Sequence, residues 1–595
     1  MPDGVRLAAD VYLPAGPGPF PTILHQTRYY RAVGMRRGFG WVALARAMDT
    51  DFVTRQRFLA AGYAWVSVCV RGSGASFGAS PFPWARAEIS DGAQVLDWIV
   101  AQPWSDGAVG STGISYAGTS AEHLAASGHR ALRAIAPRFS CFDVYPDVAF
   151  PGGIRLRSFT ESWGALNRLL DSGDVAGAVA LNLRLSGRAV ADLGPGFRWL
   201  RWAAHPAAQA LVRTGVRAVS YGAAAVGGDR AGLAAAVREH AANEDIDEGA
   251  RRVAFRDDPG LSVAVPEATV DDFSPHRGVD ALRASGIPVL SVSGGLDGGY
   301  AGAAVKRHRA LGHAGSRLIL GPWNHGGADD ASPYTEHGPA REDHAATLLA
   351  FFDHHLRGRS SDASPVSYYT LGEERWKSAA TWPPPHVTSV RYHLAADGLV
   401  EGAPPPGQRE YTVDPDVGTG HRARWDSLLG LKAPIGTADA AGLCRRALTF
   451  TSAPLARDLV ITGSPRLTVS LRSSEPDGGV FAYLLDVSPS GAPTVLTEGM
   501  LRIAHRHPDG APSYLRGASR PLDAGQVAEL CIELLPVSAV VRTGHSLRLA
   551  LTGADAHHFE AVGRAAMWTV LTGAAAVLEL PVEGAAPQPG LAFSG

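Results

Sequence analysis

The sequence predicts an α/β domain built on a parallel sheet, interrupted by a helical segment and followed by an all-β domain. Three observations support this prediction. Short apolar runs alternate with helical segments up to about residue 140, and again between residues 287 and 358. Residues 155–270 hold Ala- and Leu-rich helical stretches with no strand run of comparable strength. After about residue 360, short strands recur between Gly and Pro turns.

The first α/β part alternates strands and helices. Its expected strands lie at 5–14, 21–27, 63–70, 108–115 and 133–139. Its expected helices lie at 41–62, 88–104 and 116–128. The first strand alternates apolar and polar residues, as a strand with one solvated face does, whereas the next two are apolar runs typical of a covered sheet. The helix at 88–104 owes its apolar face to Val95, Leu96, Trp98 and Ile99.

The middle of the chain interrupts this pattern and then returns to it. Expected helices of the interruption lie at 161–170, 175–185, 205–219 and 230–244. We interpret this segment as a helical insertion that forms a cap. The resumed α/β pattern has expected strands at 287–294 and 316–323 and expected helices at 299–312 and 344–358. These elements complete the parallel sheet.

The last third predicts a β-sandwich. Expected strands lie at 389–396, 459–463, 466–474, 480–488, 500–506 and 546–553, whereas 402–445 is expected to form long loops. The chain of 595 residues is too long for one core. We therefore expect an α/β-hydrolase-type domain at 1–145 and 276–360, a helical cap at 146–275, and a β-sandwich domain at 361–595.

Composition narrows the function. A formal net charge of −2 gives no electrostatic reason to bind nucleic acid or an acidic membrane. The four cysteines lie far apart and none is in a C-x-x-C spacing, which argues against a disulfide framework or a cysteine-based zinc site. No signal peptide or membrane span is expected. We predict a cytoplasmic protein that uses no cofactor.

Two stretches match the G-x-S-x-G pattern of a nucleophilic serine. Gly74–Gly78 contains Ser76, and Gly113–Gly118, with its last glycine one place late, contains Ser115. A nucleophile elbow needs a strand before the serine and a helix after it. Prolines soon after Ser76 prevent that helix, whereas Ser115 stands between an expected strand and an expected helix. The sequence therefore favours Ser115 as the nucleophile over a serine in an ordinary strand-to-helix turn.

A serine hydroxyl needs a base, and the base needs a group that orients it. In this fold the chain order is serine, acid, histidine. Asp297 follows one late strand and His325 follows the next, and glycines come after both. Each alone is more often a turn or surface residue, but the three in this order predict a Ser115, Asp297 and His325 triad. Such a triad transfers an acyl group through a covalent intermediate.

The oxyanion of that reaction needs preset hydrogen-bond donors. The backbone N–H of Tyr116, the residue after the nucleophile, is the expected first donor. The second is expected in the loop after the strand at 21–27, where the hydroxyl of Tyr29 or Tyr30 is available. The residues alone do not choose between these two tyrosines.

At these residues the chain resembles the cocaine-esterase-like and X-prolyl dipeptidyl-peptidase serine hydrolases. The shared stretches include RGSGASFG at 71–78, GISYAG at 113–118, GGLDGG at 294–299, GPWNH at 321–325 and FFDHHLRG at 351–358. The resemblance implies a catalytic α/β domain, a helical cap and a C-terminal jelly roll, with the triad given above. It favours Tyr29 as the oxyanion tyrosine and places Trp163 near the acyl group, and we expect Phe150 in the same pocket.

The substrate is the open part of the prediction. A carboxylesterase is favoured, acting on a small-molecule ester or amide. The alternatives are an X-prolyl dipeptidyl aminopeptidase or a β-lactam acylase, and, outside the hydrolases, a non-catalytic protein that binds partners through its β-domain. An aminopeptidase needs carboxylates at its pocket rim, for which Glu161 is a candidate. Gly298 and Gly299, where relatives often have an aromatic residue, suggest a roomier pocket. Relatives often self-associate, so a homodimer is an expectation.

Metal binding is not expected. His354 and His355 are adjacent on an expected helix and therefore point in different directions. His557 and His558 lie in a loop of the β-domain without an identified partner.

Overall fold

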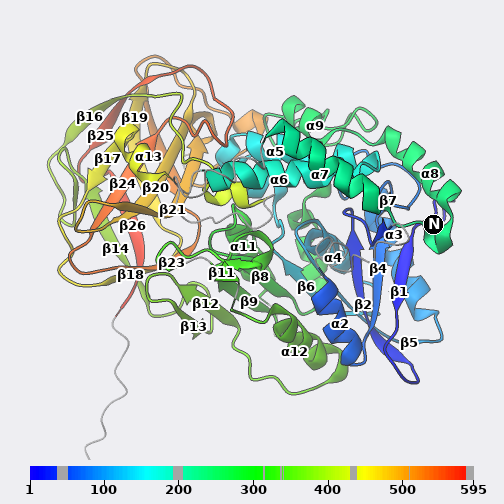
Figure 1. Ribbon diagram of the computed structural model, residues 1–595. Coiled ribbons are helices and arrows are strands. Elements are labelled where there is room, and N and C mark those ends of the chain that lie inside the picture. Colours follow the sequence, from blue (N-terminus) through cyan, green and yellow to red (C-terminus); the bar gives the residue numbers. More distant parts are fainter. Residues whose placement is uncertain are drawn as a thin grey trace, which may run out of the picture. The chain divides into compact units, whose positions relative to one another are not determined.

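The computed structural model describes residues 1–35, 51–191, 205–312, 315–335, 338–339, 341–428, 439–507 and 510–584 (Figure 1). The chain forms two compact units. The first contains residues 1–331, 337–363 and 421–435, and the second contains 332–336, 364–420 and 436–595. The first unit is α/β and the second is almost entirely strands, which confirms the predicted fold class. No helix in the described ranges is long and apolar enough to cross a membrane.

A parallel sheet forms the centre of the first unit. Its strands within this unit lie in the order β1 (Ala9–Tyr12), β4 (Ala64–Cys69), β2 (Phe20–Thr27), β5 (Ser105–Ile114), β6 (Leu132–Arg138), β8 (Leu290–Gly294) and β9 (Arg317–Gly321). Among these strands only β1 is antiparallel to its neighbour, and the other neighbouring pairs are parallel. The carboxyl ends of β2, β5, β8 and β9 therefore share one edge of the sheet, where open α/β sheets bind their ligands.

Helices cover both faces of this sheet. Those that pack on it are α2 (Phe52–Ala60), α3 (Arg86–Val100), α4 (Tyr116–Ala126), α11 (Tyr300–Leu311) and α12 (His344–Arg357), and α10 (Val279–Ser285) packs against α4 and α11. Successive residues of a strand face opposite sides. In β5, Val109 packs in a core cluster with Leu124 of α4, whereas a Cβ on Gly110 would lie 2.5 Å from the Phe352 ring of α12. Glycine at 110 thus allows α12 to approach the sheet.

The predicted apolar face of α3 is correct at three of its four residues. Val95, Leu96 and Ile99 are buried in the core that α3 and α4 share. Trp98 is 43% exposed and packs edge-to-face against Trp104 instead. The prediction was wrong for Trp98 because residues 95 and 99 define one helical stripe and residue 98 lies beside it.

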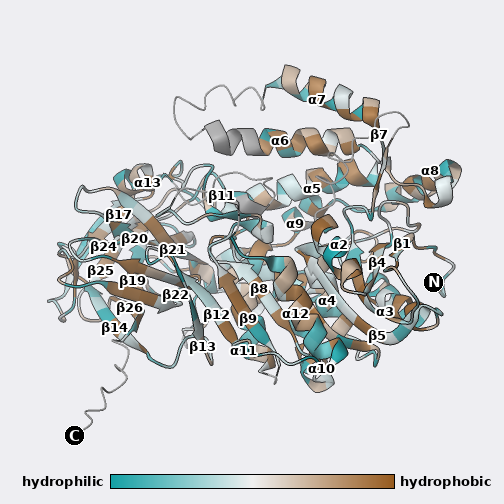
Figure 2. Cartoon of the chain, turned by 60° about the horizontal axis from the view of Figure 1, so that its bottom comes forward, coloured by the Kyte–Doolittle hydropathy of each residue, from teal (hydrophilic) through white to brown (hydrophobic). Residues whose placement is uncertain are grey.

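A helical insertion follows β6, as the sequence predicts. Its helices are α5 (Arg157–Asp171), α6 (Val175–Ala191), α7 (Pro206–Val219), α8 (Arg230–Glu239) and α9 (Ile246–Arg252). Helices α6 and α7 lie side by side and carry hydrophobic residues among hydrophilic ones (Figure 2). The short strands β3 (Val33–Met35) and β7 (Ser220–Ala223) pair antiparallel. Strands this short carry no alternation that a sequence pattern could reveal.

Short elements connect the larger ones in the first unit. Helical turns lie at Tyr145–Ala149, Pro151–Gly153, Val226–Gly228, His240–Ala242, Val270–Phe273, Pro275–Gly278, His325–Gly327 and Arg424–Leu428. The two-residue strands β10 (Asp329–Asp330) and β11 (Gly338–Pro339) pair with each other.

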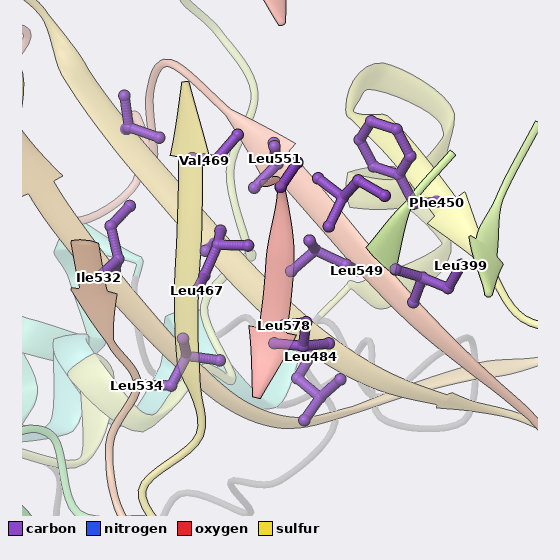
Figure 3. Close-up of a cluster of buried hydrophobic side chains, with 14 of the residues drawn as sticks. Leu399, Phe450, Leu467, Val469, Leu484, Ile532, Leu534, Leu549, Leu551 and Leu578 are labelled. Carbon is purple, nitrogen blue, oxygen red and sulfur yellow. The ribbon is translucent and has the colours of Figure 1, made fainter. Parts of the chain in front are cut away.

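The second unit packs β-sheets around a leucine-rich core. The strands of its larger sheet are β14 (Val387–Leu394), β15 (Leu399–Val400), β16 (Gly407–Thr412), β18 (Leu459–Gly463), β19 (Arg466–Ser473), β22 (Val527–Glu533), β23 (Val537–Val541), β25 (Met567–Thr572) and β26 (Val577–Glu583). The four-stranded sheet has the order β17 (Leu448–Thr451), β24 (Ser546–Thr552), β20 (Gly479–Val487) and β21 (Pro493–Arg502). Leu467 and Val469 of the first sheet meet Leu484 and Leu549 of the second (Figure 3).

Two predictions about the second unit needed correction. Residues 402–445, expected to be loops, contain β16 and, within their described part, the start of helix α13 (Ala440–Arg446). The Gly- and Pro-rich composition there concealed a strand that is held by pairing with the distant β25. The strand expected at 500–506 ends at Arg502 and continues as a helical turn at Ile503–His505. A hairpin of β12 (Val366–Thr370) and β13 (Arg375–Ala379) and a helical turn at Arg516–Ala518 complete the unit.

Candidate active site

Ser115 occupies a strained turn between β5 and α4. Its backbone has φ 58° and ψ −117°, a conformation that costs free energy in any residue but glycine. Small neighbours permit the turn: a Cβ on Gly113 would lie 2.3 Å from the Ala117 Cβ, and one on Gly118 would lie 2.8 Å from the Gly113 carbonyl oxygen. Strand, strained serine and helix are the parts of a nucleophile elbow.

Ser76, the serine of the competing motif, has a structural role. Its side chain is fully buried, donates a hydrogen bond to the Cys69 carbonyl at 2.7 Å and accepts one from the Ala8 amide at 2.8 Å. It does not line the pocket that contains Ser115. The glycine-rich loop around Ser76 thus packs beside the start of β1, and the Ser76 hydroxyl already has two backbone partners.

Asp297 and His325 are brought together as the sequence predicts. The carboxylate of Asp297 is fully buried, and His325 Nδ1 lies 3.0 Å from each of its oxygens. The loops that carry them are pressed together, because a Cβ on Gly294 would lie 2.1 Å from the Trp323 carbonyl oxygen. After His325, Gly326 and Gly327 both have positive φ, and the Gly327 carbonyl lies 2.9 Å from His344 Nε2. Burial lowers the pKa of His344 to about 4, so this supporting imidazole is neutral at pH 7.

Tyr300 links the serine and the histidine. Its ring stacks on His325 with centroids 4.9 Å apart and an interplanar angle of 22°. Its hydroxyl lies near the Ser115 side chain; burial raises the pKa of Tyr300 well above its usual value, and Ser115 lowers it slightly. The loop that carries His325 also lies beside the end of β5, since a Cβ on Gly326 would lie 3.9 Å from Ile114 Cγ2. Tyr300 was missed by the sequence reasoning. Its position, three residues after Asp297, was the available signal.

The structure distinguishes the two candidate oxyanion tyrosines. The hydroxyl of Tyr29 accepts a hydrogen bond from Trp163 Nε1 at 2.8 Å and lies near the Ser115 side chain, which slightly lowers the pKa of Tyr29. Burial raises the pKa of Tyr29 to about 12, which keeps the phenol protonated at pH 7. Tyr30 has φ 70° and donates its hydroxyl to the Leu170 carbonyl in the helical insertion. Of these two tyrosines, only Tyr29 therefore has its hydroxyl near Ser115.

Tyr116, whose backbone N–H was the expected first donor, begins α4. Its side chain is buried, stacks on Trp84 at 4.5 Å and donates its hydroxyl to Glu88 at 2.6 Å. Burial raises the pKa of Glu88 to about 7. Trp84 itself has φ 54°, and its indole Nε1 lies 3.1 Å from the Ser120 hydroxyl. These contacts fix the start of α4 beside the serine.

A pocket opens at Ser115 and lies entirely within the first unit. Its empty space, including the opening to solvent, is about 820 Å³. Trp163 and Phe150, both expected in the pocket, line it together with Ser115, Tyr116 and Tyr300. The other apolar side chains of its wall are those of Pro81, Phe82, Pro83, Trp84, Val144, Val148, Ala149, Phe159, Ile246, Ala250, Leu261, Val270 and Phe273. The pocket is therefore mainly aromatic and aliphatic.

The carboxylates around this pocket are already paired. Glu161, the candidate from the sequence, does not line it and forms an ion pair with Arg251 at 2.9 Å. Glu244 and Asp245 do line it. Glu244 accepts hydrogen bonds from the Ser262 hydroxyl and from two backbone amides, and Asp245 caps α9 and pairs with Arg168. Each of these carboxylates is thus already hydrogen-bonded or ion-paired within the protein.

Histidine pairs do not form ligand sets in the described residues. His354 Nδ1 lies 2.6 Å from the Arg359 carbonyl, and His557 Nδ1 accepts from the Gly420 amide at 3.4 Å. One group, Asp143, Asp271 and His276, has the spacing that a metal ion needs. Arg256 already donates to both carboxylates of this group at 3.0 and 2.7 Å. This guanidinium supplies the positive charge that a metal would supply.

Comparison with known proteins gives the class of the molecule. Residues 3–327 match the model of the X-Pro dipeptidyl-peptidase (S15) family, and residues 359–579 match the X-Pro dipeptidyl-peptidase C-terminal non-catalytic domain. A Mycobacterium bovis protein named "Putative serine esterase" is 40% identical over 94% of this chain and 90% of its own length. The cocaine esterase of Rhodococcus sp. is 26% identical over 93% of this chain and 89% of its own length.

Solved structures share the fold at low identity. A CocE/NonD family hydrolase from Staphylococcus aureus has a TM-score of 0.66 at 17% identity, covering 98% of this chain and 92% of its own. An aminopeptidase from a Thaumarchaeota archaeon has a TM-score of 0.68 at 18% identity, covering 98% and 95%.

The fold and these relatives define the protein as a serine hydrolase with an α/β-hydrolase domain. Its family follows from the match over more than half of its length: the chain belongs to the S15 family of X-Pro dipeptidyl-peptidases.

Proposed function

We propose that the protein hydrolyses carboxylic esters through Ser115, His325 and Asp297. One observation carries the proposal: Ser115, in its strained turn, lines one pocket with Tyr300, and Tyr300 stacks on the imidazole of His325 that is paired to buried Asp297. In this reading, residues 146–275 form the cap and 1–145 with 276–360 form the catalytic domain.

The reaction takes two steps. His325 Nε2 accepts the Ser115 proton as the hydroxyl oxygen attacks the ester carbonyl, and the resulting imidazolium then protonates the leaving alcohol. A water molecule, deprotonated by the same nitrogen, attacks the acyl-enzyme, and the proton returns to Ser115 as the acid leaves. Asp297 holds the imidazole through Nδ1, so that Nε2 is the nitrogen available to the serine.

The oxyanion is proposed to bind two donors. The first is the backbone N–H of Tyr116 at the start of α4, where the helix dipole also favours negative charge. The second is the Tyr29 hydroxyl, which is protonated at pH 7 because burial raises its pKa to about 12. Since Trp163 Nε1 already donates to the Tyr29 oxygen, the Tyr29 proton is directed elsewhere, toward the serine.

The pocket favours an uncharged, apolar or aromatic acyl group. Phe150, Phe159 and Trp163 provide apolar surface, and burying such a group gains roughly 25 cal/mol per Å² of apolar area removed from water. A substrate with a free ammonium group would need an available carboxylate. Glu244 and Asp245 are already satisfied by protein donors. We therefore favour a carboxylesterase over an X-prolyl dipeptidyl aminopeptidase or a β-lactam acylase.

A fluorophosphonate probe tests the nucleophile. Wild-type protein should be labelled, Ser115→Ala should not, and the matched control Ser76→Ala, which changes the serine of the second motif, should still be labelled. Labelling of Ser115→Ala would refute the assignment and would leave room for a non-catalytic binding protein.

A substrate panel tests the acyl preference. p-Nitrophenyl benzoate and butyrate should be cleaved, whereas a Gly-Pro anilide, which carries a free ammonium group, should be cleaved much more slowly. Faster cleavage of the anilide would identify an aminopeptidase.

A further inference from the structure

Tyr300 is held against the proposed catalytic groups by the way α11 begins. The helix starts at Tyr300, and its amide donates to the Asp297 carbonyl at 3.0 Å. A Cβ on Gly299 would lie 2.0 Å from the Asp147 carbonyl oxygen, so only glycine allows this approach. Gly298 has φ 45°. The two glycines therefore serve the close packing of the turn, and the aromatic ring at this place comes from Tyr300.

A hydrogen bond alone does not orient an imidazole. The bond from His325 Nδ1 to Asp297 fixes one nitrogen, but the ring can still turn about that contact. The remaining freedom is removed by rings on either side: Tyr300 stacks on His325, and Phe139 meets it edge-to-face with centroids 6.2 Å apart and an angle of 81°. A stacked phenol also favours a ring that becomes cationic during the reaction.

The Tyr300 hydroxyl is close to the nucleophile itself. It lies near the side chains of Ser115 and Cys141, which line the same pocket, and Tyr300 itself is only 3% exposed. Ser115 thus lies near two phenol hydroxyls, those of Tyr29 and Tyr300. Tyr29 belongs to the loop after β2, whereas Tyr300 comes from the same turn as Asp297, so it connects the acid, the base and the nucleophile.

We propose that Tyr300 is a positioning residue of this hydrolase, whose ring sets the plane of His325 and whose hydroxyl holds Ser115 toward it. The proposal rests on the proposed function of Ser115 and His325. It predicts separate effects for the ring and for the hydroxyl, since Tyr300→Phe removes only the hydroxyl and Tyr300→Met removes both at similar volume.

Steady-state kinetics with p-nitrophenyl benzoate test the proposal. Tyr300→Phe should lower kcat about 10-fold and Tyr300→Met about 100-fold or more, because misorientation of reacting groups costs rate rather than affinity. KM should change less than about 3-fold in both, since substrate is bound mainly by other parts of the pocket. Tyr63→Phe, which removes a buried hydroxyl bonded to Asp353, is the matched control and should keep its kcat.

The rate of fluorophosphonate labelling gives a second readout. The labelling rate should be highest for wild type, lower for Tyr300→Phe and lowest for Tyr300→Met, because the probe requires the same activated serine. Equal kcat losses in Tyr300→Phe and Tyr300→Met would overturn the role of the ring, and a wild-type kcat in Tyr300→Phe would overturn the role of the hydroxyl. If Tyr300→Met does not fold, Tyr300→Trp, which keeps a stacking ring without the hydroxyl, must match Tyr300→Phe for the ring's role to stand. Failure of the triad itself would appear separately, as labelling of Ser115→Ala.

Discussion

Replacing Tyr29 with phenylalanine separates catalysis from stability in this site. The hydroxyl that is lost accepts a hydrogen bond from Trp163 Nε1 and lies near Ser115. As an oxyanion donor it is expected to contribute about 100- to 1000-fold in kcat, or about 2.7–4 kcal/mol. The indole N–H that loses its acceptor costs about 1–3 kcal/mol of folding free energy. That second cost is the same in the ground state and the transition state, so it does not enter kcat.

The assay compares kcat, KM and the midpoint of thermal unfolding for three variants. Tyr29→Phe should lose kcat by the factor above and lower the unfolding midpoint. Trp163→Phe keeps the Tyr29 hydroxyl but removes the donor that orients it, so kcat should fall less than in Tyr29→Phe, and KM should also change because Trp163 lines the pocket. Tyr30→Phe removes the hydroxyl that donates to Leu170 and should leave kcat nearly unchanged. A kcat for Tyr29→Phe within about 3-fold of wild type would refute the oxyanion role, since no single donor of that kind is so dispensable.

Three further predictions concern the framework of the site. Burial raises the pKa of Glu88 to about 7 from its usual 4.5, so the folded state binds a proton that the unfolded state has released. Stability is therefore expected to fall as pH rises from about 4.5 through 7, by at most roughly 3 kcal/mol, and Glu88→Gln should flatten this dependence in urea unfolding. Arg307→Leu leaves buried Glu122 without the guanidinium 2.6 Å away and should cost about 3–5 kcal/mol; a smaller loss than in Glu122→Gln would contradict this. Gly299→Ala drives a methyl group into the Asp147 carbonyl and should lower both the unfolding midpoint and kcat, whereas normal values would show that the turn adapts.

The sequence determined the α/β class because apolar runs and helical stretches are local signals. The strands β2, β4 and β5 lie where the runs at 21–27, 63–70 and 108–115 predict them. Strands β16, β3 and β7 escaped prediction because each is held by a partner far away in the chain. Trp98 was wrongly assigned to the buried face of α3, because helical periodicity locates the edge of a buried stripe only to within one residue.

For the site, the sequence predicted the chemical groups and their order along the chain. Ser115, Asp297 and His325 were predicted because each follows a strand, and the carboxyl ends of parallel strands meet at one edge. Contacts between distant segments were decided only by the tertiary structure. It placed the hydroxyl of Tyr29 near Ser115, whereas the hydroxyl of Tyr30 donates to the Leu170 carbonyl.

The same limit explains the residues that the sequence missed or misjudged. Glu161 was a candidate for the pocket rim, yet it does not line the pocket and its carboxylate forms an ion pair with Arg251. Tyr300 had no motif, and Gly298 and Gly299 suggested empty space, although their lack of side chains is what lets the Tyr300 ring reach His325. Side-chain direction and close backbone approach depend on packing between segments far apart in the chain, and such packing leaves no periodic trace in the sequence.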